Sequence, residues 1–152
     1  DMPPNPIIEA LGARIAIAQH QTEVALARYR GALRQFPHHK ALVYGYADTL
    51  VKNSQSAKAL EFVTDQLRTY PGDYRLHELQ ARSYASQGRV LLQHQAQAEA
   101  YAELGNFPAA IEQLEIALRA GDGDFYQLSI AEARLRQLRS IEAEVKDQPD
   151  FP

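Results

Sequence analysis

The sequence has no cysteine among its 152 residues, which excludes disulfide bonds and thiolate metal sites. It has no apolar run near the roughly 18 residues that a transmembrane helix needs. The formal net charge is −3, so nucleic acid and an acidic membrane surface are not expected partners. The first residues, DMPPNP, show no secretory signal pattern, and we expect the chain to be a piece of a longer protein.

Strand-like alternation is also missing, and apolar residues recur at the helical spacing of three and four. Two helix-ending prolines, Pro37 and Pro71, are separated by a 34-residue interval, and Ala13, Ala47 and Ala81 repeat at the same interval. This length and the alternation of small and large residues resemble the tetratricopeptide repeat, in which each unit is two antiparallel helices. The sequence therefore predicts an all-α, tetratricopeptide (TPR) helical-repeat solenoid of about eight helices.

The repeat changes register in the second half. The similar stretches ARSYASQG (81–88) and AEAYAELG (98–105) begin only half of that interval apart. The helix over 89–104 is therefore expected to pair with both 73–87 and 107–119, and the solenoid is expected to bend there. The competing interpretation is a regular superhelix of identical pairs.

These signals divide the chain into a linker (1–5), a TPR-repeat domain (6–147) and a tail (148–152). The expected units are 6–39, 40–73, a half unit 74–90, 91–123 and a C-terminal capping helix 124–146. The expected helices are 6–20, 22–36, 39–53, 55–70, 73–87, 90–104, 107–119 and 124–146. Helix starts are marked by the N-cap residues Asn5, Asp73, Asn106 and Asp124. The last helix caps the stack through a polar outer face, or alternatively folds into the groove or docks a neighbouring domain.

Motifs that would carry chemistry are incomplete. HELQA (77–81) has Ala81 where a zinc protease helix needs its second histidine, so we expect no metal at His77. His38 and His39 are interpreted as turn residues, and GDGD (121–124) lacks the spacing of a calcium loop. No nucleophile, base and orienting acid can be assembled. The chain is therefore predicted to be a non-enzyme without a cofactor of its own.

The first helices of TPR units line the concave side of the stack, where peptides or partner helices bind. The candidate groove residues are Arg14, Tyr44, Asp48, Lys52, Arg75, Glu78 and Arg82. The same positions add Ala10, Ile17, Gln95, Glu99 and Glu103. The cations suit a carboxylate or backbone carbonyls, and Tyr44 suits an apolar side chain. Alternatively, these residues are only solvated helix faces. The two-lysine, two-asparagine clamp of some TPR proteins is not reproduced, because Arg14 stands where that clamp has asparagine.

The stretch YAELGNFPAAIEQLEIALRAGDGDFYQLSIAEARLRQLR (101–139) is more specific than a generic repeat. It resembles the C-terminal TPR region of bacterial periplasmic zinc metalloproteases of the β-barrel assembly-enhancing type. The resemblance is strongest over 93–139 and weak before residue 40. It implies a preceding protease domain that carries the HExxH helix and the zinc, neither of which is in this chain.

The resemblance further implies a protein–protein interaction module in the periplasm. Its partners would be outer-membrane β-barrel proteins or their assembly machinery, and its own protease domain. The alternative is a stand-alone TPR scaffold or adaptor in another complex, possibly cytosolic.

Overall fold

The computed structural model describes residues 3–148, and these residues form eight α-helices and no strand. The helices are α1 (Pro6–Ala18), α2 (Thr22–Gln35), α3 (Lys40–Lys52), α4 (Ser56–Thr69), α5 (Tyr74–Ser86), α6 (Val90–Glu103), α7 (Phe107–Arg119) and α8 (Phe125–Lys146). Each lies within two residues of its predicted bounds, which confirms the all-α prediction. Residues 1–2 of the predicted linker and 149–152 of the predicted tail lie outside the described residues. None of the helices described is both long and apolar enough to cross a membrane.

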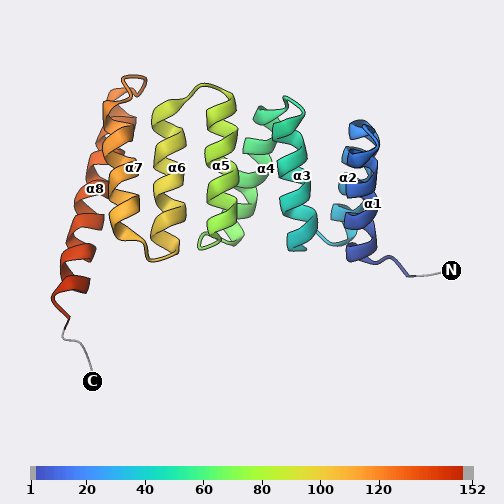
Figure 1. Cartoon of the computed structure of the whole chain (residues 1–152), viewed down its shortest axis with the longest axis horizontal. Helices are drawn as coiled ribbons and strands as arrows, with labels where there is room; N and C mark the ends of the chain where they lie inside the picture. Colours follow the sequence, from blue (N-terminus) through green and yellow to red (C-terminus); the bar gives the residue numbers. More distant parts are fainter. Residues whose placement is uncertain (1–2, 149–152) are drawn as a thin grey trace.

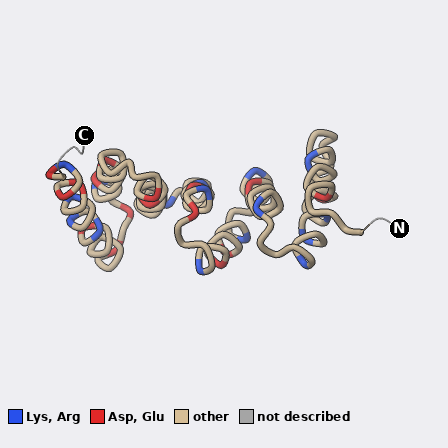
Figure 2. The backbone as a smooth tube through the Cα atoms, turned by 90° about the horizontal axis from the view of Figure 1, so that it is seen from below, with Lys and Arg blue, Asp and Glu red and all other residues tan. Residues whose placement is uncertain are grey.

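Consecutive helices pack side by side along an elongated array, with the two termini at opposite ends (Figure 1). In the first part, α3 also contacts both α1 and α5, and these three helices form one layer, while α2 and α4 lie behind them (Figure 2). In the second part the contact between alternate helices is α6 with α8. After α5 the contact between alternate helices therefore passes from odd-numbered to even-numbered helices.

Small residues at the helix crossings let the backbones approach closely. Ala13, Ala25, Ala47 and Ala59 are fully buried in the first part. Ala98, Ala110, Ala117 and Ala131 are fully buried in the second. Leucines fill the space beside them, for example Leu42, Leu76 and Leu114, and each buried leucine contributes about 1.5–3 kcal/mol. The core is a chain of small clusters along the stack, as expected for a solenoid.

Turn geometry locates the change of register. His20, Ser54 and Gly88 recur once per 34-residue unit, each with a left-handed φ of 60° to 70°. Gly105 has the same conformation, with φ 75°, after only half a unit. All four turns close with the same type of backbone bond, from Gln21 N to Ala16 O, Gln55 N to Leu50 O, Arg89 N to Tyr84 O and Asn106 N to Tyr101 O. Helix α6 thus has this type of turn at both ends, which confirms the predicted out-of-phase helix.

Helix starts are capped largely as predicted. The side chains of Asn5, Asp73 and Asn106 accept backbone N–H bonds, and Asp124 forms a capping box with Gln127. Helix α6 is different, because Arg89 at its N-cap position makes no side-chain bond. The carboxylate of Asp122 caps it instead, accepting bonds from Val90 N at 2.6 Å and Leu91 N at 2.9 Å. Sequence reasoning missed this long-range cap.

Helix α8 closes the C-terminal end of the stack. It packs on α7 and α6 and makes no contact with α1, α3 or α5, so it does not enter the groove between them. Its buried face is Ala131, Leu135 and Leu138. Its exposed residues include the charged Glu132 and Arg136 and, at its start, the aromatic Phe125 and Tyr126. These features agree with the predicted capping role.

Candidate functional site: a groove between α1, α3 and α5

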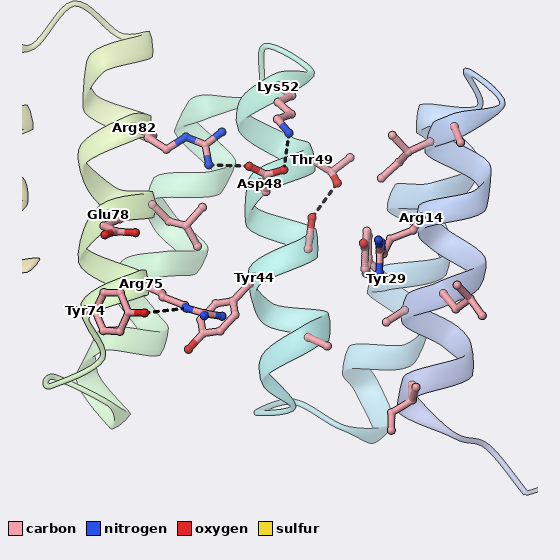
Figure 3. Close-up of a pocket in the computed structure, with 18 residues that line it drawn as sticks. Arg14, Tyr29, Tyr44, Asp48, Thr49, Lys52, Tyr74, Arg75, Glu78 and Arg82 are labelled. Carbon is pink, nitrogen blue, oxygen red and sulfur yellow. Dashed lines mark hydrogen bonds and ion pairs between the residues drawn. The ribbon is translucent and has the colours of Figure 1, made fainter.

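The layer of first helices forms one open groove of about 1000 Å³. All seven predicted site residues line it: Arg14 from α1, Tyr44, Asp48 and Lys52 from α3, and Arg75, Glu78 and Arg82 from α5. Figure 3 shows their side chains directed into the space between the three helices. The structure therefore brings the predicted residues together, and their binding role stays a prediction.

Asp48 links two cations at one end of the groove (Figure 3). Its Oδ1 lies 2.6 Å from Arg82 Nη1, and its Oδ2 lies 2.9 Å from Lys52 Nζ. Partial burial would raise the pKa of Asp48, but the bonds from Lys52 and Arg82 outweigh burial and hold the pKa below its usual value. Asp48 is therefore charged at neutral pH and ties α3 to α5.

A second carboxylate organises the other end. Asp73, the N-cap of α5, accepts a 2.5 Å hydrogen bond from the Tyr44 hydroxyl and lies 2.9 Å from Lys40 Nζ. Burial alone would raise the pKa of Asp73, but the bonds from Tyr44 and Lys40 prevail and lower it. Burial also raises the pKa of the Tyr44 phenol, and the bond to Asp73 raises it further. Tyr44 thus stays a neutral donor with a fixed ring.

The cations Arg14 and Arg75 have no carboxylate within ion-pair distance among residues 3–148. Arg75 is held by its neighbours instead: its Nε donates to the Tyr74 hydroxyl at 3.2 Å, and its guanidinium lies 5.5 Å from the centre of the Tyr44 ring. An arginine in such a position presents its remaining N–H groups to a carboxylate or to carbonyl oxygens. Glu78 lies between Arg75 and Arg82 on α5 (Figure 3).

The α1 wall is apolar, because Ile7, Leu11 and Ile17 line the groove and are exposed. The floor depends on Gly45, where a Cβ would collide with the Tyr29 hydroxyl. Sequence reasoning missed Ile7, Leu11 and Gly45 as groove residues. The sequence contained a signal for Leu11 and Gly45, because positions 11, 45 and 79 are equivalent in the 34-residue register and only position 45 is glycine where the other two are leucine.

A second hollow of about 460 Å³ lies between α5, α6 and α8. It is lined by His77, Gln80 and Tyr84 of α5, each two residues after a groove residue of the same helix. Two residues correspond to about 200° around a helix, so the two cavities use opposite faces of α5. Figure 2 agrees, because α4 and α8 flank α5 and α6 on the side away from the groove.

The second hollow contains Gln95 and Glu99. The prediction that they extend the first groove is wrong, because the out-of-phase helix turns this face to the other side. Glu103 lies against Gly72, in the α4–α5 turn. Arg134 holds Glu99 by two bonds of 2.7 and 2.8 Å. Arg89 lies over the Tyr84 ring and, like Arg75, has no carboxylate within ion-pair distance among residues 3–148. The second hollow thus presents one open cation, where the groove presents two.

The histidines of the suspected motifs serve local structure. His77 Nε2 donates to the Pro71 carbonyl at 2.8 Å, and His38 Nδ1 lies 3.4 Å from Gln66 Oε1. Across residues 3–148 no three His, Cys, Asp or Glu side chains are grouped as a metal site would need. The described part likewise shows no catalytic constellation.

These features define a helical-repeat protein whose concave surface is built by alternate helices. Two tetratricopeptide-repeat families match the sequence, one over residues 16–83 and one over 96–144. The chain is therefore built of tetratricopeptide repeats. The residues between the two matches include the α5–α6 turn, where the register changes.

No curated protein matches the sequence at a significant level. Among solved structures, the MamA RS-1 ArsTM double mutant is similar, with a TM-score of 0.60 and 15% identity. The match covers 95% of this chain and 79% of that chain. At this identity the similarity shows the fold alone.

Proposed function

We propose that this chain is a protein-interaction module that binds an extended polypeptide segment in the groove between α1, α3 and α5. Tetratricopeptide repeats suggest such a module in general. The observation that carries the proposal is the combination, in one groove, of an apolar α1 wall with two arginines, Arg14 and Arg75, that lack carboxylate partners.

The segment that fits this groove has apolar side chains on one edge and at least one carboxylate on the other. The apolar residues would pack on Ile7, Leu11 and the Tyr44 ring. The carboxylate would pair with Arg14 or with Arg75, which lie on opposite sides of α3 (Figure 3). Asp48 pairs with Lys52 and Arg82, and Asp73 pairs with Lys40. With Arg14, Arg75 and Glu78 added, five cations face three carboxylates, so the groove keeps a net positive charge.

The finer proposal is that the chain serves a periplasmic zinc metalloprotease of the β-barrel assembly-enhancing type. In that role it would bind outer-membrane β-barrel proteins or their assembly machinery and position its own protease domain. The support is the resemblance of residues 101–139. The zinc and the catalytic groups would belong to the protease domain, and this chain would need no cofactor. Reading the gene upstream of residue 1 tests the association, because an HExxH segment and a signal peptide are expected there.

Groove binding can be tested with a urea-denatured outer-membrane β-barrel protein as the probe, titrated by fluorescence anisotropy. Arg75→Glu reverses the charge of an open cation, and Tyr44→Ala removes the ring beneath it. Each should weaken binding about tenfold, consistent with loss of one good charged or aromatic contact. Arg34→Glu, an equal charge change on the exposed surface of α2, is the matched control and should bind normally.

Circular dichroism must show the same helix content for all variants. If Arg75→Glu and Tyr44→Ala both bind as tightly as the unchanged chain, the groove proposal fails. If the barrel protein never binds but an acidic apolar peptide does, the groove is retained and the proposed partner is wrong.

A further inference from the structure

The N-terminal end of the stack has an exposed apolar stripe along α1. On α1, Ile8, Leu11 and Ile15 are 47%, 52% and 50% exposed. They lie at positions i, i+3 and i+7 and form one stripe. On α8 the most exposed apolar side chains, Phe125 and Tyr126, lie together at the start of the helix, and Glu132 and Arg136 are exposed farther along it.

The 34-residue register relates this exposed stripe to buried positions on α3 and α5. Ile8, Leu11 and Ile15 correspond to Leu42, Gly45 and Thr49 on α3, and to Leu76, Leu79 and Ser83 on α5. At the later positions the face is covered, since Leu42, Leu76 and Ser83 are fully buried and Thr49 and Leu79 nearly so. The helix pair before it provides the cover: α1 and α2 pack on α3, and α3 and α4 pack on α5.

We propose that the exposed α1 stripe receives an amphipathic helix of a partner polypeptide, in the position that α4 takes on α5, so that the repeat stack continues past α1. The interface would then repeat the one already present twice in the chain. Leu11 belongs both to this stripe and to the groove wall, but the inference does not require that the groove binds a ligand.

The register also sets the chemistry of that helix. Tyr29 of α2 fits against α3 only because position 45 is glycine. Position 79 on α5 is leucine, and the α4 residue 34 positions after Tyr29 is the smaller Val63, which packs in the same cluster. Position 11 is leucine as well, so the docked helix needs a valine-sized side chain there rather than a tyrosine. Val63 and Leu67 of α4 and its C-cap residue Tyr70, at i, i+4 and i+7, pack in this cluster together with Phe62.

The test uses the chain's own α4 as the probe. A second copy of residues 56–73 is fused directly ahead of Pro6, which places its final aspartate where Asn5 caps α1. The melting temperature should rise by roughly 5 °C or more, because an end face becomes buried. Amide exchange in α1 should also slow. In the matched control the duplicated helix carries Val63→Glu, and the melting temperature should not rise.

A fusion that leaves both the melting temperature and α1 exchange unchanged would overturn the proposal, as would an equal rise in the control. Sedimentation of the unmodified chain tests the other occupant. If the chain is a dimer that Leu11→Ser converts to monomer, a second copy covers the stripe and the partner helix is wrong. Arg75→Glu should weaken groove binding in the fusion as in the parent chain, so failure here would be distinct from failure of the groove.

Discussion

The two cavities of this molecule differ in side, charge and origin. The groove of α1, α3 and α5 arises from helices in regular 34-residue phase and contains arginines without carboxylate partners. The hollow of α5, α6 and α8 arises after the 17-residue step and opens on the opposite face, and its Glu99 is paired with Arg134 while Arg89 is its one arginine without a carboxylate partner among the described residues. The comparison teaches that register decides which way a repeat surface faces. Local sequence then decides whether that surface is open to a charged partner.

The largest effect on stability is expected from substitutions in the buried core on either side of the 17-residue step. Leu76 in the regular part and Leu114 after the step are both fully buried. Truncation to alanine should cost about 2–5 kcal/mol of unfolding free energy in each case. If α6 couples the two parts, both Leu76→Ala and Leu114→Ala should lower one common urea transition monitored by circular dichroism. Two separate transitions, each sensitive to one substitution, would show that the step divides the molecule into independent units.

Substitutions in the turns should change the unfolding free energy by a smaller amount, with opposite signs in the two parts. The left-handed positions before the step are His20 and Ser54, which are strained there, whereas Gly88 and Gly105 are not. His20→Gly and Ser54→Gly should stabilise the chain by ~0.5–1 kcal/mol, and Gly88→Ala and Gly105→Ala should destabilise it by ~1 kcal/mol. Thermal unfolding measures all four.

The matched control for these turn variants is Gly31→Ala, at a helical glycine with open space around it. It should stabilise the chain by up to ~1 kcal/mol. If Gly105→Ala behaves like Gly31→Ala, the turn after α6 is not of the same kind as the other three.

The smallest expected effect is the response of the regular part to acid. Asp48 and Asp73 have pKa values below those of the unfolded chain, mainly because partners that hydrogen-bond the carboxylates outweigh burial. Their contribution to stability is therefore full above about pH 4, the unfolded value, and is lost as the pH falls through the folded values. Asp73→Asn keeps a residue suited to the N-cap but removes the titration.

The measurement is the difference in melting temperature between pH 7 and pH 3. That difference should be smaller in Asp73→Asn than in the unchanged chain. An equal difference would mean that the bonds from Tyr44 and Lys40 to Asp73 do not contribute to stability in solution.

Most of the fold was predictable because it is local. Helix bounds follow from apolar spacing and from caps such as Asn5 and Asp124, which act within four residues. The out-of-phase helix was predictable because Gly88 and Gly105 repeat the same turn signal at half the usual distance.

What escaped prediction depends on three-dimensional placement. The cap of α6 by Asp122 joins residues far apart in the chain, and nothing in their sequence spacing indicates it. Gln95 and Glu99 occupy the sequence positions of groove residues, yet the geometry of α6 directs them elsewhere. The groove residues themselves were predicted because the register carries them from unit to unit. The register has leucine at positions 11 and 79 but glycine at position 45. The reason is visible only in the structure, because the Tyr29 side chain lies where a Cβ of residue 45 would be.

The shared turn type at both ends of α6 has a consequence for the geometry of assemblies. Insertion of a single helix reverses the side on which the later cavity opens. Insertion of a full unit of two helices would leave that side unchanged. Duplication of a single half-unit segment therefore converts a one-sided scaffold into a back-to-back one. A partner held on each side would then be kept apart by the thickness of α5 alone.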